Sequence, residues 1–254
     1  MQTGWRALRE ELQRWQDAGL AATFWWRDDD AEDDTAQLGR LLRLAAALDV
    51  APALAVIPAG ATPALAQRLH NTPQVDVLQH GYAHLNHAPA AEKKAELGAH
   101  RAVQAVAGEL TLGRQRLITL VPACLPVLVP PWNRIDQRLL ARLSEHGYRG
   151  ISTFSARAAV LDAQGLTRVN THVDPIAWRG GRGFCGDTVA LRQVLEHLSE
   201  RRLGRADRTE PTGLLTHHLV QDDDCWAFCD RLITETRAFD SVTWELARAL
   251  FSAN

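Results

Sequence analysis

The chain has 254 residues, 46% of them hydrophobic and 23% charged, and its formal net charge is −2 at pH 7. This length supports one large hydrophobic core, and α/β barrels of this size are commonly single domains, so we expect residues 1–254 to form one domain. A net charge so close to zero gives no general attraction to nucleic acid or to an acidic membrane surface, and we expect neither as a partner.

Residues 1–20 predict an amphipathic helix. Trp5, Leu8, Leu12 and Trp15 recur at helical spacing, while arginine and glutamate side chains fill the opposite face. This pattern lacks the uninterrupted apolar core of a secretion signal. No later run is apolar for long enough to cross a bilayer. We therefore expect a cytoplasmic protein.

After this helix, strand-like runs alternate with helical patterns to the end of the chain. Thr62 and Pro63 are residue types that favour the cap and the first position of a helix. The expected strands cover residues 22–27, 52–58, 74–80, 126–131, 148–154, 166–173 and 212–219. The expected helices lie at 38–45, 62–70, 136–147, 187–202, 225–237 and 242–251, and a further one contains residues 91–110.

This regular alternation predicts a parallel sheet covered by helices, with about seven strand–helix units. The pattern alone fits either an incomplete barrel or a doubly wound open sheet. The segment RDDDAED after the first strand is acidic and contains no glycine, so it lacks the phosphate-binding fingerprint of a dinucleotide site. We expect no dinucleotide there.

Unusual polar and aromatic residues follow the expected strands where those strands end. In parallel α/β folds the loops at the carboxyl ends of the strands converge on one rim, where functional groups collect. The residues that fall there are Asp28, Asp29, Asp30, His80, His84, His87, Pro130, Pro131, Trp132, Asp174, Trp178, His217 and His218. We expect a site at the C-terminal rim of the sheet.

The three consecutive aspartates predict a positive partner, because adjacent carboxylates repel and the repulsion grows as water is excluded. A carboxylate with two neutral imidazoles is a common ligand set for catalytic zinc. The spacing of His80 and His84 lets both reach one ion, and His87 could join or replace one of them. The alternative is a polar loop whose histidines only form hydrogen bonds.

These segments resemble the polysaccharide deacetylase family, also called the NodB-homology or carbohydrate esterase fold. The resemblance covers most of the chain and implies a distorted (β/α) barrel. In that family an aspartate pair supplies the general base and a metal ligand, here Asp29 and Asp30, with Asp28 and Asp29 as the alternative register. A pair of histidines separated by three residues supplies the other metal ligands, here His80 and His84, and the expected cofactor is Zn²⁺ or another divalent transition metal.

Further motifs are similar to those of the same family. The turn formed by Pro130, Pro131 and Trp132 resembles the third motif, and because proline has no N–H, the Trp132 amide is the first free donor for an oxyanion. The competing interpretation is a rigid turn around a packed tryptophan. The strand GLLTHHL resembles the last motif, with His217 as the catalytic histidine. Asp174, with Trp178, resembles a further motif more weakly, and a turn-forming role for Asp174 is an equal alternative.

The sequence also departs from the family pattern. Arginine usually precedes the proline pair and orients the catalytic base, but Val129 stands there. Arg27 or Arg134 could substitute, and either could equally form a structural ion pair. Ala31 and Glu32 replace a glycine and a proline, and His218 stands where aspartate is common. These departures indicate a divergent branch of the family.

The resemblance implies a metal-dependent hydrolase that removes an acyl group, expected to be acetyl, from an N-acylated sugar or a related small molecule. Asp29 would be the base, His217 the acid and the Trp132 amide the oxyanion donor. The predicted substrate contacts are Trp26, Pro131 and Trp178. Two alternatives stay open. One is a non-catalytic barrel that binds a metal or ligand, and the other is a hydrolase of non-carbohydrate amides.

Overall fold

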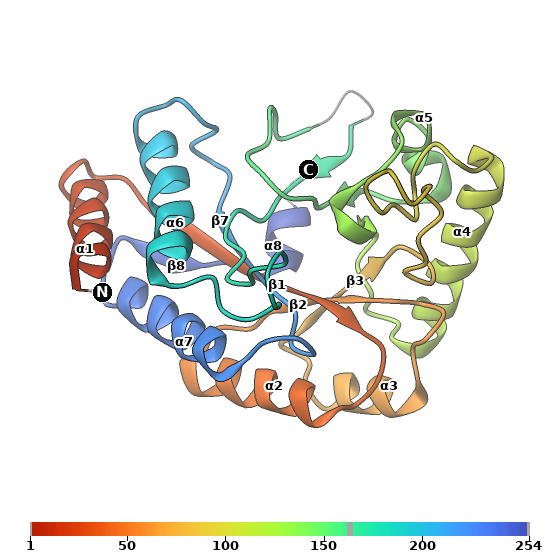
Figure 1. The fold of residues 1–254 in the computed structure, drawn as a ribbon, viewed down its shortest axis with the longest axis horizontal. Coiled ribbons are helices and arrows are strands. Elements are labelled where there is room, and N and C mark those ends of the chain that lie inside the picture. Colours follow the sequence, from red (N-terminus) through yellow and green to blue (C-terminus); the bar gives the residue numbers. More distant parts are fainter. Residues whose placement is uncertain (1, 162–164, 253–254) are drawn as a thin grey trace.

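A computed structural model describes residues 2–161 and 165–252 (Figure 1). The strands in this part of the chain are β1 (Ala22–Ala31), β2 (Ala53–Val56), β3 (Asp76–His80), β4 (Val127–Val129), β5 (Gly150–Ile151), β6 (Thr167–Arg168), β7 (Thr212–Thr216) and β8 (Val242–Trp244). The α-helices are α1 (Gln2–Asp17), α2 (Ala36–Leu48), α3 (Pro63–His70), α4 (Val103–Leu120), α5 (Gln137–Leu140), α6 (Asp187–Arg202), α7 (Asp223–Arg237) and α8 (Ala247–Phe251). Two short 3₁₀ turns span Pro131–Asn133 and Leu143–His146.

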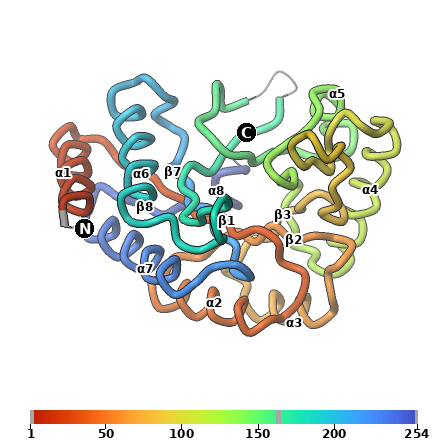
Figure 2. The backbone as a smooth tube through the Cα atoms, viewed as in Figure 1, coloured from red at the N-terminus to blue at the C-terminus, as the bar shows by residue number. Residues whose placement is uncertain are grey.

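All paired strands are parallel, which confirms the predicted fold class. The sheet runs in the order β6-β5-β4-β3-β2-β1-β7 and curls into a distorted barrel with helices outside it (Figures 1 and 2). An irregular segment after β6 spans the gap between the two edges. Thr171 forms a bridge with Phe154 beyond β5, and Val173 forms a bridge with Leu214 of β7. The chain therefore closes the barrel with a segment that is not itself a regular strand.

Side chains of β1 alternate between the inside and the outside of the barrel. Trp25 belongs to the inner cluster with Ala53, Leu78 and Val127, whereas Trp26 packs in the larger cluster between the sheet and the outer helices. At the end where the strands begin, α8 covers the barrel, and its Phe251 lies edge-on to Trp25 with ring centroids 6.2 Å apart. The opposite end of the barrel is left for the loops that follow the strands.

Three expected helices differ from the structure, and the one expected at 136–147 is divided into α5 and the 3₁₀ turn Leu143–His146. Residues 242–251 were expected to form one helix, but Val242–Trp244 forms β8, which pairs with the start of β1 and so overrides the helical pattern. The helix expected to contain residues 91–110 begins only at Val103, so residues 91–102 are not helical. The residues before it form a loop that is held by side chains, since Asn86 Oδ1 accepts hydrogen bonds from the amides of Ala88 and Ala95.

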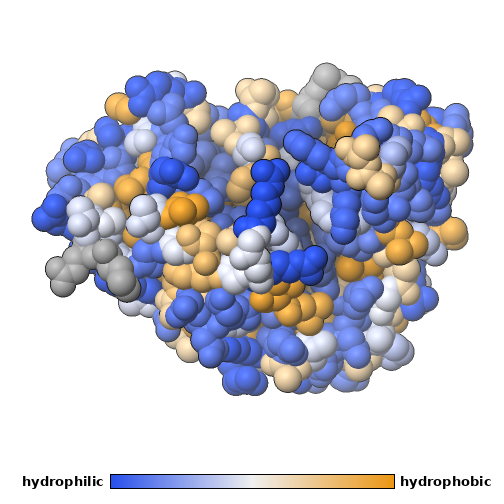
Figure 3. All heavy atoms as spheres, in the orientation of Figure 1, coloured by the Kyte–Doolittle hydropathy of each residue, from blue (hydrophilic) through white to orange (hydrophobic). Residues whose placement is uncertain are grey.

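The surface in the same orientation is largely hydrophilic, and hydrophobic residues form small separate groups (Figure 3). Among the described residues, none of the helices combines the length and the apolar character needed to cross a membrane.

Gly213 of β7 packs against the irregular segment that closes the barrel, and there is no room for a side chain at this position. A Cβ there would lie 2.5 Å from Trp25 Nε1 and 2.6 Å from the carbonyl oxygen of Asn170. We therefore expect Gly213→Ala to lower the free energy of unfolding by about 2–3 kcal/mol, because the backbone and a buried indole must move. Gly108→Ala is the matched control, since nothing lies within 4 Å of its Cβ position on exposed α4, and it should be neutral or stabilising by up to about 1 kcal/mol. Urea denaturation midpoints measure both, and equal stabilities would contradict the prediction.

Candidate functional site

The acidic end of β1 departs from a regular strand. Asp28 pairs with Leu54 and Ala31 pairs with Val56, so β1 has one extra residue over this stretch, which is a β-bulge. Asp30 has a φ of 72°, in the left-handed region that residues other than glycine rarely adopt. Because the bulge interrupts the alternation of side chains, Asp30 is aimed independently of Asp28.

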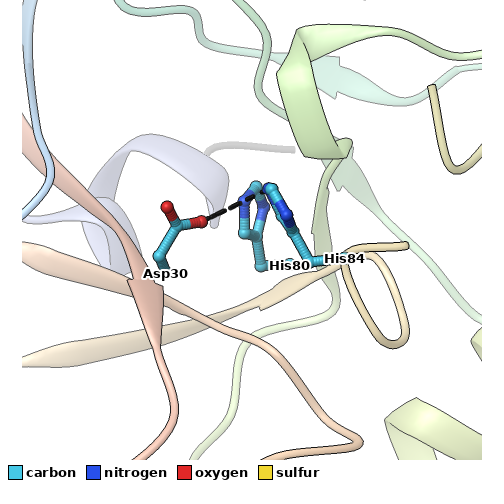
Figure 4. Close-up of side chains that lie close together, drawn as sticks. All are labelled: Asp30, His80 and His84. Atoms are coloured by element: carbon cyan, nitrogen blue, oxygen red, sulfur yellow. Dashed lines mark ion pairs between the residues drawn. The ribbon is translucent and has the colours of Figure 1, made fainter. Parts of the chain in front are cut away.

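Asp30, His80 and His84 meet at the C-terminal rim (Figure 4). Asp30 Oδ1 lies 3.1 Å from His80 Nε2 and 3.4 Å from His84 Nε2. This oxygen is buried, yet it makes no geometrically sound hydrogen bond to any described residue. Three atoms that can each offer a lone pair therefore face one another across a short gap. The donor set of one carboxylate and two imidazoles fits a divalent cation.

Neighbouring groups orient these three side chains. His80 Nδ1 lies 2.9 Å from the carbonyl oxygen of Val129, and donating its proton there leaves the Nε2 lone pair directed at Asp30. His84 has a φ of 53°, and its ring packs against Trp132 with centroids 4.3 Å apart. Burial acts to raise the pKa of Asp30, but the imidazoles of His80, His84 and His217 outweigh it, so this pKa lies below its usual range.

Glu96 holds the backbone of the histidine loop, a contact that the sequence analysis did not anticipate. Its carboxylate is 1% exposed and accepts hydrogen bonds from the amides of Tyr82 at 3.1 Å and Ala83 at 2.7 Å. These amides lie between His80 and His84. Glu96 therefore fixes the turn that brings both imidazoles to one point. Its place within a stretch that resembled a helix gave no sign of this contact.

Asp29 forms a buried ion pair with Arg27. The guanidinium contacts both carboxylate oxygens, with Nε to Oδ1 at 2.8 Å and Nη2 to Oδ2 at 2.9 Å. Neither side chain is more than 3% exposed. Arg134, the other candidate, instead donates to the carbonyl oxygen of Lys94 on the surface. Of the two arginines considered, Arg27 is the one that contacts the predicted base.

Asp28 points to the outer side of the strand and has its own partners. Its carboxylate accepts hydrogen bonds from Thr216 Oγ1 at 2.6 Å and from the amide of His218 at 3.1 Å, and it lies 2.5 Å from His218 Nδ1. Burial acts to lower the pKa of His218, but the negative charge of Asp28 outweighs it and raises that pKa. This placement favours the Asp29 and Asp30 register over the Asp28 and Asp29 register.

His217 lies directly after β7, beside the segment from Asp174 to Trp178. Its ring makes an edge-to-face contact with Trp178 at 4.7 Å between centroids, and its buried Nδ1 has no hydrogen-bond partner among the described residues. Trp178 Nε1 donates to Asp174 Oδ2 at 2.7 Å. Burial raises the pKa of Asp174, and the nearby imidazole of His217 partly offsets this. The weaker motif thus lies against the predicted acid.

The turn from Pro131 to Asn133 carries two consecutive residues in the left-handed region. Trp132 has a φ of 54° and Asn133 a φ of 56°. The amides of Asn133 and Arg134 close the turn by donating hydrogen bonds to the carbonyl oxygens of Pro130 and Pro131. The Trp132 amide takes no part in these two bonds. Trp132 is half-buried and Pro131 is buried.

Two predicted site residues lie away from this centre. Trp26 was predicted to contact substrate, but it is 1% exposed, packs beneath the outer helices and donates its indole N–H to Thr216 Oγ1 at 2.8 Å. Such a buried ring has no surface to offer a ligand, so this placement argues against the prediction. His87 is turned towards Arg101, whose Nη1 lies 3.1 Å from His87 Nε2.

A second cluster, formed by His172, His197 and Glu210, lies where the barrel closes. Glu210 Oε2 lies 3.5 Å from His172 Nε2 and 3.7 Å from His197 Nε2, distances that would suit a shared ion. The imidazoles, however, are stacked with centroids 3.4 Å apart and planes 13° apart, so their in-plane lone pairs run side by side and do not converge. His172 Nδ1 also accepts the amide proton of Gly213, which leaves the ring proton of the neutral imidazole on Nε2. This geometry disfavours a cation.

Comparisons with known proteins agree with this architecture. No protein-family profile matches the sequence, and no curated protein matches it at a significant level. A protein named as a polysaccharide deacetylase from Mycobacterium smegmatis gives a TM-score of 0.69 at 17% identity, covering 91% of this chain and 88% of that one. A family 4 acetyl xylan esterase from Clostridium thermocellum, in complex with a cobalt ion, gives a TM-score of 0.53 at 12% identity. The match covers 91% of this chain and 90% of the esterase chain. A mutant of a CE4 family pseudoenzyme, with restored enzymatic activity, gives a TM-score of 0.58 at 14% identity. The match covers 91% of this chain and 68% of the pseudoenzyme chain. These matches establish the fold as that of the polysaccharide deacetylases, as the motifs predicted.

The stacked cluster should make stability depend on pH. Burial lowers the pKa of His197 from 6.5 to about 4, so between these values the unfolded chain takes up a proton that the folded chain does not. The free energy of unfolding should therefore fall with acidification over this interval, by up to about 1.4 kcal/mol per pH unit from this group. His197→Gln should remove that part of the slope. Urea titrations of both proteins from pH 7 to pH 4 measure it, and identical slopes would contradict the prediction.

Proposed function

We propose that the protein is a metal-dependent hydrolase that removes an acyl group, in the first instance acetyl, from an N-acylated sugar or related small molecule. The observation that carries this proposal is the meeting of Asp30, His80 and His84, with the buried oxygen of Asp30 facing two imidazole nitrogens. The proposed base, Asp29, lies beside Asp30 at the end of β1, and the proposed acid, His217, directly follows β7, which pairs with β1. The cobalt ion in the acetyl xylan esterase supports a cation of this kind.

Each side chain around the centre has a chemical task in this proposal. Asp30, His80 and His84 would hold Zn²⁺ or another divalent transition metal, and a bound ion would supply Lewis-acid activation of the acyl group and of water near neutral pH. Asp29 accepts a proton from the attacking water. His217 donates a proton to the departing amine, a task that imidazole side chains commonly perform in catalysis. The Trp132 amide donates to the developing oxyanion.

The surface beside His217 suits a small ring-containing substrate. Trp178 is 43% exposed, and its indole is fixed by the hydrogen bond to Asp174, so it offers a rigid aromatic face next to the acid. We propose Trp178 as the main substrate contact. Pro131 is buried and shapes the turn beneath Trp132. The names of the fold relatives, which include a polysaccharide deacetylase and an acetyl xylan esterase, favour an acylated carbohydrate over other amides.

A second candidate function is binding without turnover. The observation that favours it is Val129 at the position where family members resembling this chain carry the arginine that orients the base. The CE4 family pseudoenzyme among the fold relatives shows that this fold can lose activity. The contact of Arg27 with Asp29 weighs against this candidate, because the carboxylate is oriented all the same.

The proposed function predicts that the protein binds a metal ion. Purified protein loaded with Zn²⁺ and dialysed should hold about one ion per chain. His84→Ala should weaken binding by about 100-fold or more, because even changes outside the ligand shell cost about 10–100-fold. His172→Gln is the matched control and should retain the ion, since the stacked cluster does not present converging lone pairs. Mass spectrometry of metals measures all three, and loss of the ion only from His172→Gln would reverse the assignment.

The proposed function also predicts that the protein hydrolyses an N-acylated compound. The metal-loaded protein should release acetate or formate from at least one member of a panel of N-acylated sugars and amines, measured by a coupled assay. Asp29→Asn and His217→Ala should each lower the rate by about 10²–10⁴-fold, because each removes one proton-transfer group. Both variants should keep their metal. Absence of release from every panel member, together with tight binding of one of them, would favour the non-catalytic candidate.

A further inference from the structure

The guanidinium of Arg27 makes more contacts than an ion pair requires. It is 0% exposed, and each of its five N–H groups has an acceptor. Two of them contact Asp29, as described. Nη1 donates to Ser152 Oγ at 2.6 Å and to the carbonyl oxygen of Thr153 at 3.3 Å, and Nη2 also donates to Asn133 Oδ1 at 3.0 Å. The fully satisfied fork leaves the guanidinium one orientation.

The contact with Asn133 connects Arg27 to the turn that carries Trp132. Consecutive left-handed residues other than glycine cost of order 1–3 kcal/mol each and persist only where their surroundings hold them. Asparagine tolerates such a φ, whereas a bulky tryptophan rarely adopts it. The hydrogen bond from Arg27 fixes the side chain of Asn133 and so helps to hold the Trp132 amide in place.

We propose that Arg27 is a positioning residue that fixes the proposed base and the proposed oxyanion donor relative to one another. The Nε–Nη2 edge of its planar fork sets the plane of the Asp29 carboxylate, and the remaining Nη2 proton sets the Trp132–Asn133 turn. The proposal rests on the proposed function. It also explains how the strand end can do without arginine at position 129, because the guanidinium reaches Asp29 from within β1 itself.

Lysine cannot replace this arrangement. Its ammonium keeps the positive charge beside Asp29, but it is a point charge without a planar fork and cannot match both carboxylate oxygens and Asn133 together. Arg27→Lys thus separates charge from geometry. A structural ion pair would be largely satisfied by lysine, whereas a positioning role would not.

The test compares Arg27→Lys with two single-contact variants. Asn133→Gly removes the acceptor on the turn and still tolerates a positive φ. Ser152→Ala removes an acceptor that bonds to Nη1 and does not belong to the turn. On the best panel substrate, Arg27→Lys should lower kcat by about 10²-fold with KM little changed, because misplacement acts on the transition state. Asn133→Gly should lower kcat by about 10-fold and Ser152→Ala by no more than about 3-fold. Metal content should stay at the wild-type level in all three.

A second readout is independent of turnover. Protein labelled with 5-fluorotryptophan gives a fluorine resonance for Trp132, identified by its absence in Trp132→Phe. This resonance should shift or broaden in Arg27→Lys and Asn133→Gly and stay in place in Ser152→Ala. An unchanged resonance together with an unchanged kcat in Arg27→Lys would overturn the proposal. So would equal effects in Asn133→Gly and Ser152→Ala.

The two proposals fail in different ways. If the wild-type protein hydrolyses no panel member, the proposed function fails, and the fluorine spectra still decide whether Arg27 holds the turn. If the wild-type protein is active and Arg27→Lys is equally active with an unperturbed Trp132 resonance, the proposed function stands and the role of Arg27 fails.

Discussion

Three adjacent carboxylates at the end of one buried strand can be ionised together only if each has a positive or hydrogen-bonding partner of its own. Here each one does. Asp28 turns outwards to His218 and Thr216, Asp29 turns inwards to Arg27, and Asp30 is aimed by the bulge at His80 and His84. The bulge at Asp30 is what makes this division possible, because a regular strand would direct Asp28 and Asp30 to the same face. The geometry of the whole rim follows from this separation of charge.

Proximity of ligand-type atoms does not by itself define a metal centre. Both histidine clusters bring two imidazoles and a carboxylate together within similar distances. They differ in direction and tautomer. In the rim cluster, His80 is directed by a carbonyl acceptor on Nδ1, and its Nε2 lone pair is free to face Asp30. In the stacked cluster of His172, His197 and Glu210, the amide of Gly213 donates to Nδ1 of His172, and the two imidazole rings are stacked. Only the first cluster satisfies the requirements of a shared cation.

Local sequence signals anticipated the fold and the convergence of the rim residues, and long-range partners lay beyond them. The spacing of His80 and His84 and the acidic run after the first strand are short patterns, so one sequence was enough to bring Asp30, His80 and His84 together as candidates. The choice between Arg27 and Arg134 depended on which side chain faces into the barrel. The strand β8 could not be distinguished from a helix because its pairing partner lies at the other end of the chain. Glu96 acts through backbone amides, which leave no pattern in side-chain identity.

The partners of the acidic strand end come from very different distances along the chain. Asp29 finds its arginine two residues away, the imidazoles for Asp30 come from β3, and His218 reaches Asp28 only from the C-terminal third, 190 residues later. A nascent chain that has been synthesised only as far as β3 thus carries one aspartate whose counter-charge has not yet emerged from the ribosome. Because synthesis proceeds from the N-terminus, the interior pair is able to form before the residues of the outer pair are both present. The last of these contacts forms when β7 pairs with β1, because His218 lies two residues beyond the end of β7 and reaches Asp28 from there.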